Sequence, residues 1–303
     1  MARTLNHVEM ISNEGRPRNV TRRHYESYGD FVEHIEELDE NKTEGWGDTS
    51  MKATSSDWTL GADYEDSKNL AVDGWTKGRK MMQKKMSDAL NSHPMPELRN
   101  DWANDNWGFM LDVGSYLAGD ELCALRPDES THEATNVVKL RVSLACASGV
   151  SDKMKANWGV GIAFLIDRLE AQGKSVAIEA CYYTEGHCGT TEDGETVGKN
   201  YLTTITLKNA GEPLDLDRVA YIIAHPAAHR RLIWRTRECE KSLGGDYGGP
   251  RRLPQTDEQH LINIEGVQFN QTQSATVESS IDAVTKIYNS QVEALDEVAM
   301  AQR

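Results

Sequence analysis

The chain has 303 residues and carries a formal net charge of −15, with 33 Lys+Arg against 48 Asp+Glu. This length can bury a real core and suits one or two domains. The longest apolar stretch, residues 158–166, is about half the ~18 residues that a membrane helix needs, so we expect no membrane partner. The N-terminus lacks an apolar signal core, and the five cysteines are scattered. Both features favour a cytoplasmic protein with reduced thiols.

The first third of the chain predicts an arm followed by helices. Residues 1–24 are polar and Arg-rich with little periodicity, so we expect a mobile basic arm. Apolar residues recur at helical spacing over residues 28–38. A second helix is predicted over residues 67–90, broken near Gly74 and stopped by the two prolines that follow it.

The second half of the chain predicts alternating strands and helices. Strands are expected at 137–146, 175–184, 201–208 and 261–264, and helices at 155–172, 216–224 and 228–241. This order is typical of a split-βαβ (ferredoxin-like) core. We therefore predict an α+β fold with an antiparallel or mixed sheet and extra N-terminal and C-terminal helices. The predicted organisation is an arm (1–24), one α+β domain (25–273) and a C-terminal helix (274–303).

Positive charge is concentrated in three short segments of this acidic chain. Residues 16–23, 74–85 and 229–252 hold sixteen of the 33 basic residues. Basic side chains gathered in this way repel one another, and the arrangement therefore indicates that an anionic partner binds there. The first segment lies in the predicted arm and is expected to be an accessory.

The second basic segment predicts a helix with one apolar and one cationic face. Trp75 and the methionines share a face at 100° per residue, and most of the lysines lie opposite them. The candidate phosphate contacts here are Lys77, Arg79, Lys80, Lys84 and Lys85. The alternative interpretation is an ordinary solvated helix face.

The third basic segment combines arginines, aromatic residues and a glycine-rich loop. Glycine lets such a loop adapt, an aromatic ring can stack on a base, and guanidinium groups can take phosphates. The alternative is a plain mobile loop between a helix and a strand. The candidate residues of this segment are Arg230, Arg231, Trp234, Arg235, Tyr247, Arg251 and Arg252.

The sequence offers no recognisable catalytic motif. It contains neither a GxxxxGK[ST] phosphate loop nor a GxSxG nucleophile motif. His225 and His229 have the i,i+4 spacing of a metal-binding helix, but Pro226 stands where a zinc protease needs a glutamate. We therefore expect a non-enzymatic protein with no catalytic residue, no metal and no cofactor.

Three stretches together resemble a family of uncharacterised tailed-phage proteins. They are NLAVDGWxxG at 69–78, DVGSYLAGD at 112–120, and the strand–helix run at 137–169 that includes Asn-Trp-Gly at 157–159. The similarity covers about residues 57–240. Within that family the chain is similar to a single-stranded-DNA-binding RNA polymerase cofactor of Pseudomonas podoviruses. The resemblance implies a preference for single-stranded DNA and recruitment of a phage RNA polymerase in the host cytoplasm.

These observations lead to one expectation and one alternative. We expect a non-enzymatic single-stranded-DNA-binding transcription cofactor whose partners are single-stranded DNA and a phage RNA polymerase. A homo-oligomer is left open. The alternative is a phage structural or host-interaction protein that binds no nucleic acid. The expectation requires the basic helix and the glycine-rich loop to lie on one surface of the fold.

Overall fold

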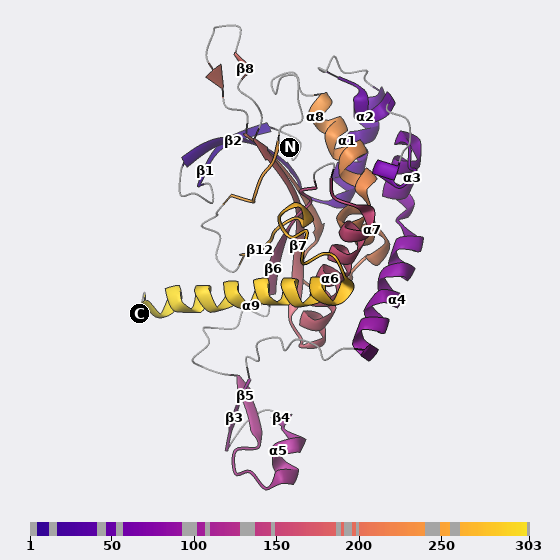
Figure 1. The fold of residues 1–303 in the computed structure, drawn as a ribbon. Coiled ribbons are helices and arrows are strands. Elements are labelled where there is room, and N and C mark those ends of the chain that lie inside the picture. Colours follow the sequence, from indigo (N-terminus) through magenta and orange to yellow (C-terminus); the bar gives the residue numbers. More distant parts are fainter. Residues whose placement is uncertain are drawn as a thin grey trace.

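The computed structural model combines a mixed β-sheet with flanking helices (Figure 1). The predicted α+β class is therefore confirmed. The structure describes residues 5–11, 17–40, 47–52, 57–92, 102–106, 110–127, 137–146, 149–185, 189–190, 196–197, 200–239, 249–254 and 261–301.

The main sheet has the strand order β1-β2-β10-β7-β6-β12, and β11 adds to the end of β7. Three pairs of neighbouring strands are parallel, namely β2–β10, β7–β6 and β6–β12. Two pairs, β1–β2 and β10–β7, are antiparallel. The strands are β1 (Leu5–Ile11), β2 (Pro17–Tyr25), β6 (Val137–Ser143), β7 (Ser175–Glu185), β10 (Asn200–Lys208), β11 (Gly249–Pro250) and β12 (Leu261–Ile264). A separate short ribbon joins β8 (Gly189–Thr190) to β9 (Thr196–Val197).

The predicted order of elements in the second half is confirmed, but a ferredoxin-like core is not. Strand β6 is followed by helix α6 (Asp152–Ala171), and β7 returns directly beside β6, with Leu140 opposite Ile178. A split-βαβ unit would place another strand between these two. Instead, β10 lies on the outer side of β7 and β12 on the outer side of β6.

The N-terminal segment forms strands where the sequence predicts a mobile arm. Strand β2 pairs in parallel with β10, placing Val20 opposite Asn200. Val20 and Tyr25 are buried, and Val20 packs with Tyr183 and Leu202. The arm prediction is therefore wrong over β1 and β2, because β2 pairs with β10 and buries apolar side chains on both faces of a sheet built from distant sequence.

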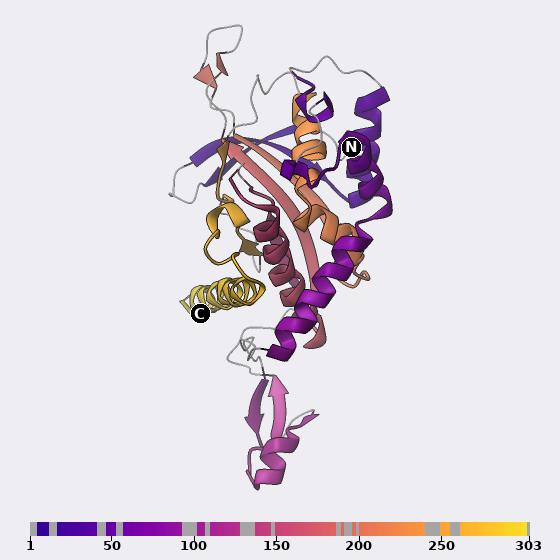
Figure 2. The ribbon, with the colours of Figure 1, turned by 45° about the vertical axis from the view of Figure 1, so that its right-hand side comes forward.

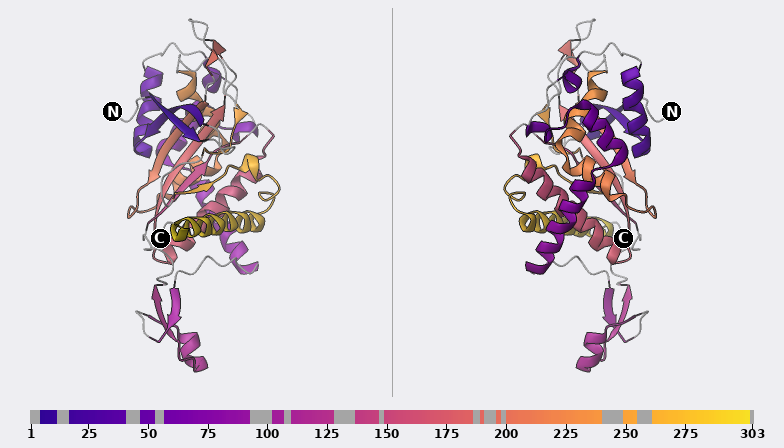
Figure 3. Two further views of the ribbon diagram at one scale, coloured as in Figure 1. Left: turned by 90° about the vertical axis from the view of Figure 1, so that its left-hand side faces the viewer. Right: turned by 90° about the vertical axis from the view of Figure 1, so that its right-hand side faces the viewer.

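Most of the helices lie on one face of the sheet. They stand in front of it in the right-hand panel of Figure 3, whereas the strands come to the front in the left-hand panel. No helix within the described ranges is long and apolar enough to span a membrane. The remaining helical elements of the main body are α1 (Tyr28–Glu40), α2 (Thr49–Lys52), η1 (Asp57–Thr59), α3 (Tyr64–Asp73), α4 (Thr76–Ser92), α7 (Leu216–Ala224), η2 (Ala228–Ile233), α8 (Trp234–Glu238), η4 (Val267–Phe269) and α9 (Val277–Ala301).

Helix α6 is the central helix of the core. Its predicted apolar stripe, which includes Trp158, Ile162 and Leu165, packs on β6 and β7. Helix α9 lies across its outer side, and a side chain at Gly161 would place its Cβ 2.8 Å from the carbonyl oxygen of Ser280. Glycine is therefore needed where the two helices approach most closely.

A small module projects from the main body (Figures 1 and 2). Its three-stranded sheet has the order β3-β5-β4, and α5 follows β4 in the chain. The elements are β3 (Trp102–Asp105), β4 (Met110–Leu111), α5 (Val113–Ala118) and β5 (Ala124–Pro127).

Candidate nucleic-acid interface

Helix α4 begins at a break that glycine makes possible. Gly74 ends α3 with a φ of 81° and donates its N–H to the carbonyl of Leu70. The next N–H, of Trp75, donates to the carbonyl oxygen of Asp217 at 3.0 Å, and the Trp75 ring meets His225 edge-on at 4.7 Å. As the sequence predicts, Trp75 anchors the start of α4 to the body.

The inner face of α4 is fixed by packing on other helices. Met82 is buried against Val160 and Ala224, and Ala89 packs against Phe164. Because this face is buried, the opposite face must point to solvent.

Three of the five predicted basic residues on α4 extend into solvent. Lys77, Lys80 and Lys84 are exposed. Arg79 instead donates from Nε to Oδ1 of Asp217 at 2.9 Å, and Lys85 donates from Nζ to Oδ1 of Asn157, also at 2.9 Å. The predicted cationic face is present, with its two inner members bonded to the body.

A further cation, which sequence reasoning missed, joins this face from α6. Lys153 is exposed in the first turn of α6. Burial lowers the pKa of Lys85 below its usual value, and repulsion from Lys153 lowers it further. We call Lys77, Lys80, Lys84, Lys85 and Lys153 the lysine surface. Only the packing of α4 on α6 brings Lys153 near Lys85, so local sequence gave no signal of it.

The helical arginines of the third basic segment lie in the interior. Only a few per cent of Arg230, Arg231 and Arg235 is exposed. Arg231 donates to the carbonyl oxygens of Ser50 at 2.9 Å and Ala62 at 3.3 Å. The prediction that these three residues face a phosphate backbone is therefore wrong, because their guanidinium groups are bonded inside the protein.

Their partners explain this burial. Arg230 donates to the carbonyl of Trp58 and lies over its ring, with 4.6 Å from Cζ to the ring centre. Arg235 donates to the carbonyl oxygen of Leu38 at 3.4 Å and forms an ion pair with Asp39 at 3.6 Å. The three arginines thus tie residues 38–62 to η2 and α8, and these hydrogen bonds reduce the cost of burying their charges.

Trp234 packs among other aromatic rings. Its ring centre lies 5.1 Å from that of Trp58 and 5.8 Å from that of His229. Its Nε1 is 3.4 Å from the hydroxyl oxygen of Tyr182. These contacts fix the ring but leave it half-buried, so the role of Trp234 in base stacking stays a prediction.

The last candidates lie near the end of strand β7. Arg251 is 59% exposed and forms an ion pair with Glu185 at 3.1 Å. Arg252 is exposed, and its guanidinium lies over the ring of Phe269 at 4.9 Å. Tyr247 falls outside the described residues, so its stacking role stays a prediction.

The structure places the lysine surface and the Arg251–Arg252 pair on different parts of the body. Helix α4 packs on α6, α7 and α9, whereas β11, which precedes Arg251, pairs with β7 at Glu185 and Thr184. The two views in Figures 1 and 2 likewise show α4 on the opposite side of the body from the upper end of β7. Arg251 and Arg252 therefore share no surface with α4, and the glycine-rich loop that precedes them lies outside the described residues. Among the residues that the structure describes, the lysine surface is the candidate.

A family model described as "Domain of unknown function (DUF7192)" matches residues 5–291. The chain belongs to this family. No curated protein matches it, and no solved structure does. The DUF7192 match takes in both the main sheet and the projecting module and ends within α9.

The i,i+4 histidines of this DUF7192 chain surround a buried lysine. The Nζ of Lys155 donates to the carbonyl oxygen of His225 at 3.1 Å and lies 3.3 Å from Nδ1 of His229. Burial lowers the pKa of Lys155 to about 8 and that of His225 to about 3. Across the described ranges, no group of three or more His, Cys, Asp or Glu side chains could hold a metal ion.

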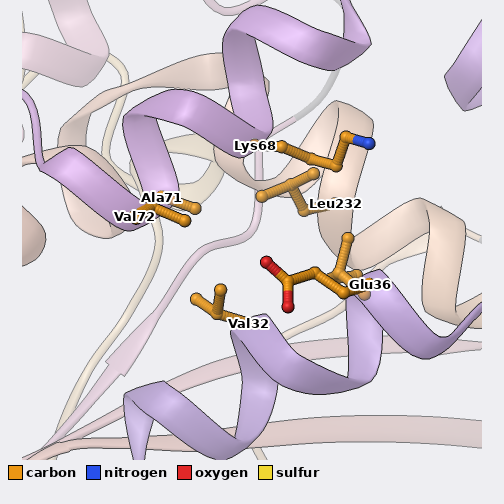
Figure 4. Close-up of a pocket in the computed structure, with 7 residues that line it drawn as sticks. Val32, Glu36, Lys68, Ala71, Val72 and Leu232 are labelled. Carbon is orange, nitrogen blue, oxygen red and sulfur yellow. The ribbon is translucent and has the colours of Figure 1, made fainter. Parts of the chain in front are cut away.

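A small hollow lies between α1, α3 and η2 (Figure 4). Its walls are mainly apolar, and Val32, Val72 and Leu232 contribute to them. The carboxylate of Glu36 points into the gap, whereas the amino group of Lys68 points away, toward its ion pair with Asp39 at 2.9 Å. The hollow therefore brings no set of reactive groups together, and we assign it no chemistry.

Proposed function

We propose that the chain is a non-enzymatic protein that binds single-stranded DNA and contacts its backbone phosphate groups with the lysine surface. One observation carries this proposal: like charges converge on one face of a chain whose net charge is −15. Lys77, Lys80 and Lys84 are exposed in a row on α4, and Lys153 repels Lys85 beside them. A bound polyanion would relieve that repulsion, and the release of counterions would favour binding.

The narrower parts of the proposal rest on the resemblance. Single-stranded DNA as the preferred form, a phage RNA polymerase as protein partner and the host cytoplasm as the place of action follow from similarity to the phage cofactor. The lysine surface supports the binding of a phosphate backbone, which single-stranded DNA shares with duplex DNA and RNA. The choice among these polymers is thus an outcome of the test.

The test is fluorescence anisotropy of labelled single-stranded DNA, duplex DNA and RNA at two salt concentrations. We expect single-stranded DNA to bind most tightly and to weaken as salt rises. The double variant Lys80→Glu/Lys84→Glu should lose at least tenfold in affinity. A control with the same charge change, Lys52→Glu/Lys286→Glu, alters exposed lysines on α2 and α9 and should bind nearly as well as the wild type. Equal loss in both variants would show that total charge, rather than the lysine surface, sets the affinity.

The polymerase proposal needs its own measurement. Purified phage RNA polymerase should be retained by the immobilised full chain and should still be retained by the Lys80→Glu/Lys84→Glu variant. Loss of retention in that variant, or in wild type after nuclease treatment, would mean that nucleic acid bridges the two proteins.

A second candidate function is a phage structural or host-interaction protein. It is favoured by the exposed apolar side chains of the projecting module, such as Tyr116 and Leu117. The absence of binding to all three polymers, with the protein folded, would leave this as the better proposal.

A further inference from the structure

The projecting module exposes an unusual amount of apolar surface. Among the residues that the structure describes, eight large hydrophobic side chains are exposed, and five of them belong to this module. Soluble proteins seldom leave such side chains clustered unless they contact something. The five are Leu111, Val113, Tyr116, Leu117 and Leu122, and we call them the α5 patch.

Helix α5 is well formed although none of its residues is buried. Oδ1 of Asp112 accepts hydrogen bonds from the N–H groups of Gly114 at 3.0 Å and Ser115 at 3.3 Å. Gly119 closes the helix in the left-handed region, with a φ of 80°. The helix is therefore fixed by its two caps and by a hydrogen bond at 3.2 Å from Nδ2 of Asn104 on β3 to Oγ of Ser115, rather than by burial of its apolar side chains.

The apolar residues of α5 share one face and leave it open. Val113, Tyr116 and Leu117 stand at the i, i+3, i+4 spacing that brings side chains together on a helix. Their exposed fractions are 58%, 59% and 78%. An amphipathic helix normally buries this stripe, so the stripe on α5 is free to meet another molecule.

Charge around the patch restricts what that molecule can be. Residues 102–127 contain one basic residue, Arg126, against the acids Asp105, Asp112, Asp120 and Glu121. Hydrogen bonds from Ser115 lower the pKa of Asp112, which therefore stays ionised at neutral pH. The acids would repel nucleic acid and would also repel the same face of a second copy.

We propose that the α5 patch is a docking surface for a basic amphipathic segment of another protein. Its apolar side chains would cover Tyr116 and Leu117, and its Lys or Arg side chains would face Asp120 and Glu121. Central aromatic and aliphatic anchors within a charged rim are the usual arrangement of such interfaces. The α5 patch lies outside the lysine surface, so the inference stands whether or not the chain binds DNA.

The probe is a synthetic helical peptide with leucines on one face and lysines on the other. A matched peptide carries glutamates in place of the lysines. Calorimetry with the full chain should detect binding of the lysine peptide and none of the glutamate peptide. Leu117→Asp should weaken binding of the lysine peptide by at least tenfold, because it places a charge in the centre of the apolar contact.

Val72→Asp is the matched control, because Val72 is 50% exposed on α3 in the main body and receives the same charge. It should bind the lysine peptide like wild type, and so should Lys80→Glu/Lys84→Glu. A photo-crosslinking residue at position 117 should label the peptide, whereas the same residue at position 72 should not. Leu117 is already exposed, so its replacement should leave the circular dichroism spectrum unchanged.

Three results would overturn the proposal. One is equal binding of the lysine peptide to wild type and Leu117→Asp. Another is that wild type sediments as a dimer and the Leu117→Asp variant as a monomer, because the α5 patch would then bind a second copy of this chain. The third is binding of wild type, but not of Leu117→Asp, to neutral phosphatidylcholine vesicles, which would make the patch a lipid contact.

Discussion

Lys155 and His229 meet in the protein interior, with 3.3 Å between Nζ of the lysine and Nδ1 of the histidine. Both residues are almost fully buried. Burial and the positive charge of Lys155 hold the pKa of His229 well below its usual value. The imidazole is therefore neutral and can accept a hydrogen bond from the lysine.

This relationship predicts that the free energy of unfolding falls on acidification. The unfolded chain binds protons at His225 and His229 below about pH 6.5, whereas the folded chain keeps both neutral until much lower pH, near 3 for His225. Since the unfolded state then holds more protons, stability is lost as the pH falls through this window. Each histidine contributes up to about 1.4 kcal/mol per pH unit.

The variant His229→Gln isolates one of these contributions. Glutamine can still accept from Lys155 but cannot take up a proton. We expect the stability advantage of wild type over this variant to shrink between pH 6.5 and pH 4.5 in urea denaturation. Parallel stability curves for the two proteins across this range would contradict a neutral, buried His229.

Arg231 should matter for folding and not for DNA. Its two terminal nitrogens donate to the carbonyls of Ser50 and Ala62. Arg231→Met should cost about 2–4 kcal/mol, because it removes both of these buried hydrogen bonds and leaves the Ala62 carbonyl with only the Thr59 hydroxyl as donor. Arg231→Lys should recover little, because one ammonium cannot reproduce the planar fork. Urea denaturation measures the loss. Anisotropy on the folded fraction should give wild-type affinity for single-stranded DNA, and a loss of affinity with full stability would instead place Arg231 in the DNA site.

Local patterns in the sequence were sufficient to predict most elements of the second half of the chain. Strand β12 and helix α7 begin and end where their apolar residues predict. The order of strands was not predictable in the same way. It depends on β7 returning beside β6 and on β2 adding to β10, which are pairings between residues far apart in the chain. Nothing within residues 17–25 alone reveals that β10 has an edge to fill.

The candidate site was predicted in part for a similar reason. Charge and periodicity locate Lys77, Lys80 and Lys84 correctly on the outer face of α4. The same reasoning failed for Arg231 and Arg235, because a guanidinium with five donors can be buried when carbonyls of distant segments accept from it. Residues 38–62 supply those carbonyls, and no local pattern in the sequence predicts that they pack against η2 and α8.

Gly74 should be needed for the break between α3 and α4. Its φ of 81° strains any other residue, and an added Cβ would lie 2.5 Å from Cβ of Asp217. Gly211 has the same φ with no atom within 4 Å of an added Cβ, so Gly211→Ala isolates the backbone strain, about 1–2 kcal/mol. Gly74→Ala should cost about 1–3 kcal/mol more, because the neighbouring backbone must move. Similar losses for both variants in thermal or urea unfolding would show that the contact with Asp217 is relaxed at no cost.

Tyr247 remains the predicted stacking residue of the glycine-rich loop. If its ring stacks on a base, Tyr247→Ala should weaken binding of single-stranded DNA by about 1–3 kcal/mol, whereas Tyr247→Phe should keep most of the affinity. Arg251, which follows this loop in the chain, lies on a different part of the body from the lysine surface, so we expect the effect only with oligonucleotides long enough to reach both. The same loss with a short oligonucleotide would place the loop at the primary site, and no loss with a long one would remove Tyr247 from the interface.

Lys153 gives the sharpest test of the lysine surface, because it was identified only from the packing of α6 on α4. If it contacts one phosphate, Lys153→Gln should reduce the slope of log affinity against log salt by about 0.7 for a single strand. It should weaken all oligonucleotide sequences equally, since phosphate contacts carry no base information. Lys286→Gln, on α9, removes the same charge and should leave the slope unchanged. An equal change of slope in both variants would mean that Lys153 acts only through the net charge of the protein.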